Sequence, residues 1–257
     1  MNGKGGVGKT LLTTNLAAMF ARIGLLASII DRDPQPTANG WSLDRKRFNI
    51  DPPIGAVQAH TISEVDWRVK QARQQAADVI LIDTPPRLDE DAAKIATLAD
   101  AVLVPLKPEP YFVKALPQTL ALLTAAKKRH FVVLTAAELQ GPELTEVQES
   151  LRAAGTPVAP FVLYRRKPFW NRSQQGMTAA DFDPTGKAAA ELLGLALWVV
   201  ENVGLLTNIQ KYKSMLQAAE RTSQILRQLR ELNDDEADHE ARADNLRPDP
   251  RDKRRAG

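Results

Sequence analysis

A glycine-rich run near the start of the sequence constrains the fold more than any other segment. Read from Gly3, it fits the pattern G-x-x-x-x-G-K-[ST], with Gly8, Lys9 and Thr10 in the fixed positions. Glycines let successive backbone N–H groups turn inward to form an anion nest, and a following helix adds the positive end of its dipole. The run therefore predicts a phosphate-binding loop that leads into a helix over residues 9–22.

Two later segments have the form of a short buried strand that ends in aspartate. The first covers residues 25–31 and continues from Asp31 as D-R-D-P-Q. The second covers residues 79–83, ends at Asp83 and is followed by a threonine and two prolines. Because ligands bind at the carboxyl ends of the strands in an α/β sheet, we expect these carboxylates to face one site.

Strand and helix patterns alternate along most of the chain, which predicts an α/β fold with a mainly parallel sheet and helices on both faces. Thr61 with Glu64 predicts a capping box, and Asp183 with Pro184 predicts the start of the last helix of the domain. The expected helices lie near 9–22, 62–76, 89–98, 112–128, 143–154 and 184–203, and the expected strands near 25–31, 79–83, 101–106, 130–135 and 158–163.

The order and spacing of the three motifs resemble the deviant Walker A ATPases of the ParA/MinD group. That group's phosphate loop reads K-G-G-x-G-K-[ST], and the run here extends from Lys4 to Thr10. A weaker resemblance continues through residues 101–112 and 175–191, so that it covers roughly residues 3–203. It implies a P-loop NTPase fold, ATP and Mg²⁺ as ligands, and a homodimer that forms when ATP binds.

The resemblance also assigns roles to single residues. Lys9 would bridge the β- and γ-phosphates, Lys4 would reach the phosphates bound by the partner subunit, and Asp33 would position the attacking water. We expect Mg²⁺ to be held through Thr10, Asp31 and Asp83. The expected nucleotide contacts are Gly5, Gly6, Val7, Gly8, Lys9, Thr10, Leu11 and Thr84.

The sequence departs from this pattern at two places. A buried strand feeds the phosphate loop of a P-loop fold, but only Met1, Asn2 and Gly3 precede Lys4. Either translation starts upstream of Met1, which we favour, or the first strand is missing and the sheet exposes two unpaired edges. The second departure is Leu11, where many relatives have Thr or Ser, and we expect it to weaken nucleotide binding without abolishing it.

A basic cluster lies late in the domain, where Arg165, Arg166, Lys167 and Arg172 are interleaved with two aromatic residues. Cations on a loop can neutralise DNA phosphates without reading the base sequence. ParA proteins bind nucleoid DNA through a comparable surface, so the resemblance makes these residues candidates for DNA binding. A solvated loop with no ligand is an equally weighted interpretation.

The sequence divides into three parts. Residues 1–204 form the expected ATPase domain, residues 205–232 have the pattern of an amphipathic helix with a basic face, and residues 233–257 are highly charged and expected to be disordered. The helix could pack on the domain, contact DNA or a partner, or bind a membrane surface. A membrane role is the least favoured, because the basic helix of MinD-like proteins ends their chain and here a polar tail follows.

Composition excludes several other classes of protein. Of the 257 residues 44% are hydrophobic, which is enough for one sizeable core. The sequence contains no cysteine, so neither a disulfide nor a thiolate metal site can form. The histidines are scattered at 60, 130 and 239, so metal binding by them is not expected. No signal sequence is visible, so we expect a cytoplasmic protein, and the net charge of +3 is only mildly basic. Association with the nucleoid is what the resemblance to ParA proteins implies.

The function that this reading favours is plasmid or chromosome partition by a slow, partner-stimulated ATPase. The dimer would coat DNA non-specifically, and a ParB-like centromere-binding protein or an analogous cargo adaptor would stimulate hydrolysis. The alternatives are an accessory ATPase of conjugative transfer or secretion that positions a protein cargo, a MinD-like ATPase on a membrane, and an inactive scaffold.

Overall fold

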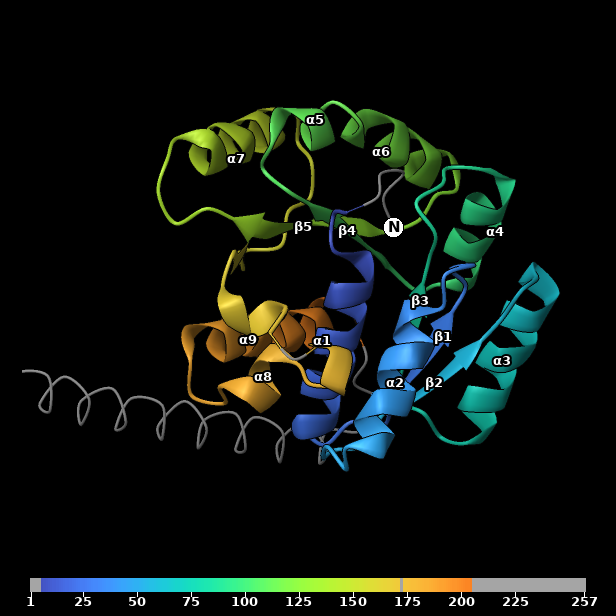
Figure 1. Cartoon of the computed structure of the whole chain (residues 1–257). Helices are drawn as coiled ribbons and strands as arrows, with labels where there is room; N and C mark the ends of the chain where they lie inside the picture. Colours follow the sequence, from blue (N-terminus) through green and yellow to red (C-terminus); the bar gives the residue numbers. More distant parts are fainter. Residues whose placement is uncertain (1–5, 172, 205–257) are drawn as a thin grey trace, which may run out of the picture.

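Two groups of three parallel strands form the centre of the protein in a computed structural model that describes residues 6–171 and 173–204 (Figure 1). The first group has the order β2-β1-β3 and the second the order β4-β5-β6. Every strand pair is parallel, as the alternation of strands and helices predicts. The strands are β1 (Ala27–Asp31), β2 (Gly55–Gln58), β3 (Val79–Asp83), β4 (Val102–Leu106), β5 (His130–Ala137) and β6 (Leu163–Tyr164).

Helices cover both faces of the strands, which confirms the predicted fold class. In Figure 1, α5, α6 and α7 lie on one side of β4 and β5, and α1, α8 and α9 lie on the other. The α-helices are α1 (Lys9–Arg22), α2 (Thr37–Arg47), α3 (Ile62–Gln74), α4 (Glu90–Leu98), α5 (Pro110–Val113), α6 (Leu116–Ala125), α7 (Glu143–Ala153), α8 (Ala179–Phe182) and α9 (Lys187–Val203). Two short 3₁₀ turns, η1 (Lys167–Phe169) and η2 (Ser173–Gln175), lie between β6 and α8.

The core is divided by the sheet because neighbouring strand residues point to opposite faces. Ile29 of β1 packs with α1, α8 and α9, whereas Ile30 packs with α3 on the other face. In the same way Val133 of β5 joins the cluster of α1 and α9, whereas Val132 joins that of α4, α5, α6 and α7. The two faces thus hold separate apolar layers.

The two strand groups are not hydrogen-bonded to each other in the described part of the chain. β3 pairs with β1 on one side, and β4 pairs with β5 on one side, while no described strand pairs with the other edge of either. Among the described strands, β2-β1-β3 and β4-β5-β6 are therefore two separate groups.

Several element boundaries differ from the prediction. The helix expected to start at Asp183 and Pro184 starts at Lys187 with Gly186 as N-cap, and Asp183 instead ends α8. The strand expected at 158–163 is reduced to a bridge at Val158 and the short β6, because Pro157 and Pro160 have no N–H to donate.

Other differences lie in the helices. The helix expected at 112–128 is two helices, α5 and α6, separated by two residues and with a proline near the start of each. Helix α2 and strand β2 were not predicted. Thr61 is the N-cap of α3 as predicted, and its hydroxyl accepts from the Glu64 N–H at 3.2 Å. The Glu64 carboxylate accepts from the N–H of His60, the residue before the N-cap, at 2.6 Å.

Of the helices in residues 6–171 and 173–204, none combines the length and the apolarity needed to cross a membrane. The amphipathic helix predicted at 205–232 and the tail at 233–257 lie outside the described residues.

Candidate functional site

The phosphate loop turns into α1 through two glycines with left-handed backbones. Gly6 has φ 76° and Gly8 has φ 88°, a region that side chains with a Cβ rarely adopt. Gly8 is the N-cap of α1, and its carbonyl accepts the first helical bond from Leu12 N–H at 2.8 Å. Between the glycines, Val7 is fully buried and its carbonyl accepts a bond from the Thr135 hydroxyl at 3.0 Å. This hydrogen bond holds the phosphate loop against β5.

The two motif aspartates that end strands lie side by side. β1 and β3 are neighbours in register, and Asp31 is the direct partner of Asp83 at their carboxyl ends. Both side chains are buried, with exposures of 0% and 1%. The strand register therefore brings together two of the three residues predicted to hold Mg²⁺.

Lys9 completes this group from the first turn of α1. Burial lowers the pKa of its ammonium group, and the nearby charges of Asp83 and Asp33 oppose that effect. The interactions show that the lysine of the phosphate loop, the strand-end Asp83 and the loop Asp33 share one electrostatic environment. Of the three residues predicted to be catalytic, Lys9 and Asp33 are thus close together, whereas Lys4 lies outside the described residues, as does Gly5.

The loop after β1 is organised around the Asp31 carboxylate. Its oxygens accept the backbone N–H of Asp33 at 3.1 Å and that of Asn39 at 2.9 Å. Burial raises the pKa of Asp31, and these backbone bonds and one from Ala38 act in the opposite direction. Asp33 in turn accepts the N–H of Gln35 at 2.9 Å. The D-R-D-P-Q segment is therefore folded back onto its own first aspartate.

The environment of the Asp83 carboxylate suits the binding of a cation. Burial raises its pKa to about 6, and a hydrogen bond from the Thr10 hydroxyl opposes the rise. One of its oxygens, Oδ2, is buried and has no hydrogen-bond partner in the described part of the protein. Oxygen ligands suit Mg²⁺. Thr10, Asp31 and Asp83 thus fit the predicted metal role, with the buried Oδ2 as the atom left to be satisfied.

The remaining predicted nucleotide contacts differ in their surroundings. Thr84 is buried directly after Asp83, at the same edge of the sheet. Leu11 is half-buried and packs against the apolar cluster of α1, so its side chain contributes to the core. Gly6, Val7 and Gly8 form the turn described above.

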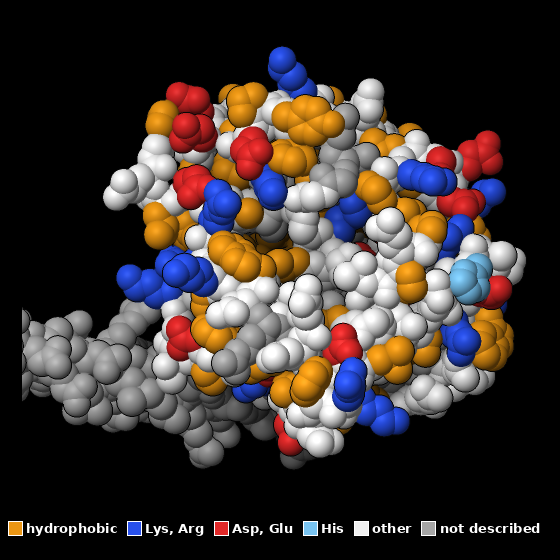
Figure 2. All heavy atoms as spheres, viewed as in Figure 1, with side chains coloured by type: hydrophobic (Ala, Val, Ile, Leu, Met, Phe, Trp, Pro, Cys, Tyr) orange, Lys and Arg blue, Asp and Glu red, His pale blue; other side chains and the backbone are white. Residues whose placement is uncertain are grey.

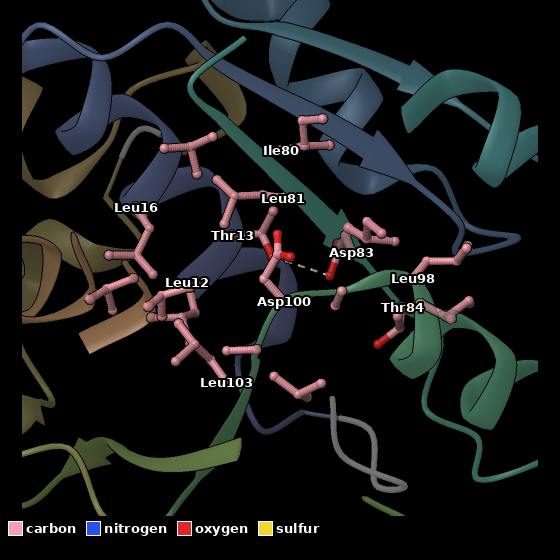
Figure 3. Close-up of a pocket in the computed structure, with 18 of the residues that line it drawn as sticks. Leu12, Thr13, Leu16, Ile80, Leu81, Asp83, Thr84, Leu98, Asp100 and Leu103 are labelled. Carbon is pink, nitrogen blue, oxygen red and sulfur yellow. Dashed lines mark hydrogen bonds between the residues drawn. The ribbon is translucent and has the colours of Figure 1, made fainter. Parts of the chain in front are cut away.

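Three residues at the site were missed from the sequence. The Thr13 hydroxyl lies 3.5 Å from Asp83 Oδ1, as the dashed line in Figure 3 shows. Thr13 follows Thr10 by three residues on one face of α1, a spacing that could have revealed it. Arg32 donates to Asp91 at 3.0 Å and its backbone N–H donates to the Asp83 carbonyl, while Thr135 holds the phosphate loop. No local pattern marks the last contact, because 128 residues separate its partners.

Helix α2, which follows the Asp33 loop, is held at its far end by a buried arginine. Arg45 is 1% exposed and forms an ion pair with Asp181 at 2.6 Å. It also donates to the carbonyls of Asp51, Pro52 and Gly176 at 2.8 to 3.0 Å. The hydrogen bonds of its guanidinium group thus go to two segments, residues 51–52 and 176–181. They fix α2 against the segment that leads into α8.

The predicted DNA-binding residues differ in their exposure and in their ion pairs. Arg166 is half-buried and bonds the Glu191 carboxylate at 2.7 Å, whereas Arg165 is exposed and pairs with Glu138 at 2.8 Å. Lys167 is exposed in η1, and Arg172 lies outside the described residues. On the face drawn in Figure 2, Lys and Arg side chains occur in several separate places with Asp and Glu among them.

A family model matches most of the chain. It describes the CobQ/CobB/MinD/ParA nucleotide-binding domain and matches residues 1–246. Among curated proteins, the maintenance of carboxysome distribution protein A of Halothiobacillus neapolitanus is 26% identical over 197 residues, which cover 74% of this chain and 89% of that protein. The chromosome-partitioning ATPase Soj of Thermus thermophilus is 26% identical over 234 residues and is covered to 94%, with 79% of this chain.

Among solved structures, the septum site-determining protein MinD of Pyrococcus horikoshii, complexed with Mg-ADP, superposes with a TM-score of 0.65. It is 16% identical, and the match covers 81% of this chain and 97% of that one, so it speaks for the fold. The family model adds what the fold alone does not give, because it spans the phosphate loop and both aspartate-terminated strands. The chain belongs to the ParA/MinD family of nucleotide-binding ATPases.

Proposed function

We propose that this protein hydrolyses ATP slowly, forms a homodimer when ATP binds, and in that state binds DNA non-specifically to partition a plasmid or chromosome. The observation that carries the proposal is the convergence of Lys9, Asp31, Asp33 and Asp83 at the carboxyl ends of β1 and β3. A lysine among carboxylates at the start of a helix suits a triphosphate with its metal ion.

Each residue has a distinct part in the proposed reaction. Lys9 would bind the β- and γ-phosphates, and Thr10, Asp31 and Asp83 would hold Mg²⁺ through oxygen atoms and water. Bound Mg²⁺ supplies positive charge to the phosphate oxygens. Asp33, whose backbone is fixed by Asp31, would orient the attacking water. Lys4 would reach the nucleotide of the partner subunit, as the resemblance implies.

The names of the relatives support two kinds of cargo. Soj of Thermus thermophilus is a chromosome-partitioning ATPase, and the Halothiobacillus protein maintains the distribution of carboxysomes. Positioning of a protein cargo is therefore the second candidate function. The ion pairs of Arg165 and Arg166 favour it, because a cation that is already paired with a carboxylate contributes less to phosphate binding.

The first test is binding to a non-specific DNA duplex with ATP, with ADP and without nucleotide, at one fixed salt concentration. We expect binding with ATP only. Binding that is equal in all three conditions would contradict an ATP-dependent dimer, and no binding in any of them would favour a protein cargo.

Two loop variants separate nucleotide binding from dimerisation. Lys9→Ala is expected to abolish ATP binding, whereas Lys4→Ala should leave ATP binding by the monomer intact and prevent ATP-dependent dimers. Binding is measured with a fluorescent ATP analogue, and dimers by light scattering. Equal loss of ATP binding in both variants would remove the cross-subunit role of Lys4.

The DNA surface is tested with Arg165→Ala combined with Lys167→Ala, the two exposed cations of the basic cluster. Arg166 is kept, because its removal would leave the half-buried Glu191 without its partner. The matched control removes two exposed cations of α2, Lys46 and Arg47. We expect weaker ATP-dependent DNA binding and a smaller salt dependence in the first variant only. Unchanged DNA affinity would show that the basic cluster is a solvated loop.

A further inference from the structure

Arg32 lies at the junction between the sheet and the loop that carries Asp33. It stands between the two aspartates of the D-R-D-P-Q segment, directly after the last residue of β1. Its backbone N–H donates to the Asp83 carbonyl at 2.9 Å, which extends the parallel pairing of β1 with β3 by one bond. The orientation of Arg32 therefore decides the direction in which the chain continues to Asp33.

The side chain of Arg32 reaches the helix that follows β3. Its Nη2 atom donates to Oδ2 of Asp91, in the first turn of α4, at 3.0 Å. The start of α4 is fixed by contacts of its own, because the Asp89 side chain caps it by accepting the N–H of Ala92 at 2.9 Å and Ile95 is buried one turn later. The ion pair thus attaches the Asp33 loop to an element that is held independently.

The ion pair bridges a space between two loops. A cavity of about 60 Å³ separates them, and its lining includes Arg32 and Pro34 from the loop after β1 and Thr84 and Pro85 from the loop after β3. Of the described residues, Arg32 and Asp91 form the only side-chain hydrogen bond between residues 32–36 and residues 84–91. The position of the Asp33 loop relative to α4 therefore depends on this pair.

The guanidinium group of Arg32 in turn depends on the Asp91 carboxylate. The Arg32 side chain is only 15% exposed, and its Nε is buried without a hydrogen-bond partner in the described part of the chain. A cation with so little access to water is costly once its counter-charge is removed. Without the carboxylate, the guanidinium would turn out toward water, and the loop backbone to which it is attached would move with it.

We propose that the ion pair between Arg32 and Asp91 holds Asp33 in the position from which it orients the attacking water. Arg32 is then a positioning residue, which acts on the reaction through the residue that follows it in the chain. Its effect on hydrolysis rests on the proposed function of Asp33, whereas its effect on the loop does not.

Three variants of the full chain and one matched control test the pair. Asp91→Ala removes the carboxylate, Arg32→Met removes the charge but keeps a long side chain, and the third variant combines both changes. The control is Glu90→Ala, which removes the other acid of the first turn of α4 and only an exposed pair with Lys94 at 3.7 Å. Since both acids lie near the positive end of the helix dipole, the control accounts for the loss of that interaction.

The first measurement is amide hydrogen exchange by NMR without nucleotide. The N–H groups of Asp33, Gln35 and Thr37 donate to acceptors within residues 31–35, so their exchange reports the opening of the loop. We expect exchange to be roughly 10-fold faster in each single variant. The double variant should show no further increase, because the same interaction is already lost in either single variant. Glu90→Ala should leave the exchange unchanged.

The second measurement is the rate of ATP hydrolysis in a single turnover, with the protein in excess, together with the Kd of a fluorescent ATP analogue. We expect hydrolysis to be slower by on the order of 10-fold in each single variant, because Asp33 is displaced, and no slower in the double variant. The Kd should stay within about twofold, since the phosphate loop and Lys9 are unchanged. A general loss of stability would not produce this split between rate and affinity.

Three results would overturn the proposal. Unchanged exchange of the loop amides in Asp91→Ala would show that the pair does not hold the loop. Faster exchange with unchanged hydrolysis would remove the positioning role of Arg32. A double variant in which the two single effects multiply would show that the two residues act separately. A parent protein that binds ATP without hydrolysing it would instead contradict the proposed function, and amide exchange would still decide whether the pair holds the loop.

Discussion

Replacement of Asp83 by asparagine is expected to stabilise the protein when metal and nucleotide are absent. The Asp83 carboxyl is 1% exposed, and its Oδ2 has no hydrogen-bond partner among the described residues. Burial raises its pKa from 3.8 to about 6, so the folded state disfavours the charged form. Asparagine has nearly the same shape and carries no charge, and it removes this cost.

The size and the pH dependence follow from the pKa change. A pKa that is raised on folding means that the folded state binds more protons than the unfolded state between about pH 4 and pH 6. Stability therefore falls as the pH rises through this window and levels off above it. The change from 3.8 to about 6 corresponds to about 3 kcal/mol at pH 7.5, to about half of that at pH 5, and to less than 1 kcal/mol near pH 4.

The assay is urea denaturation in EDTA at pH 7.5, 5 and 4 for the parent protein and Asp83→Asn. Asp66→Asn serves as the control, because Asp66 forms only a surface pair with Lys70 and should change stability by less than about 0.5 kcal/mol. Addition of Mg²⁺ and nucleotide should stabilise the parent and not the variant. A variant that is less stable than the parent at pH 7.5, or one whose gain is the same at pH 4, would refute the reasoning.

Three further changes test the local structure through urea denaturation. Thr61→Ala removes the cap of α3 and is expected to cost about 1 kcal/mol, whereas Thr61→Ser should cost little; equal losses would show that the hydroxyl is not the stabilising group. Arg45→Ala leaves the buried Asp181 without its main partner and should cost about 3–5 kcal/mol, an expectation that a loss below 1 kcal/mol would contradict. Gly176→Ala should also destabilise, because Gly176 has φ +73° and a Cβ there would collide with the backbone of Arg45. Gly155→Ala, with φ +64° and open space around it, is the control for backbone strain alone.

The parts of the site that could be predicted from the sequence are those fixed by short-range rules. The phosphate loop, the two strands that end in Asp31 and Asp83, and the cap at Thr61 each depend on residues close together in the chain. Their convergence also followed, because parallel strands bring their carboxyl ends to one edge.

The parts that were missed depend on distant contacts or on proline. Helix α2 contains Gly40 and few apolar residues, and it is stabilised by the burial of Trp41 and Arg45 against segments more than 130 residues away. The strand at 158–163 was predicted from its apolar residues, but Pro157 and Pro160 have no N–H group to donate to a neighbouring strand. The pairings of Arg165 and Arg166 with glutamates in other elements likewise have no local signal.

The attachment of α2 has a mechanical consequence for the loop that carries Asp33. Because Arg45 ties α2 to residues 51–52 and 176–181, the helix cannot travel as a rigid body without breaking a buried ion pair. Any displacement of Asp33 must then be produced by bond rotations within residues 32–36. Pro34 and Pro36 each fix one backbone φ angle there, so few torsion angles of the loop between β1 and α2 can change. Asp33 can accordingly adopt only a few distinct positions.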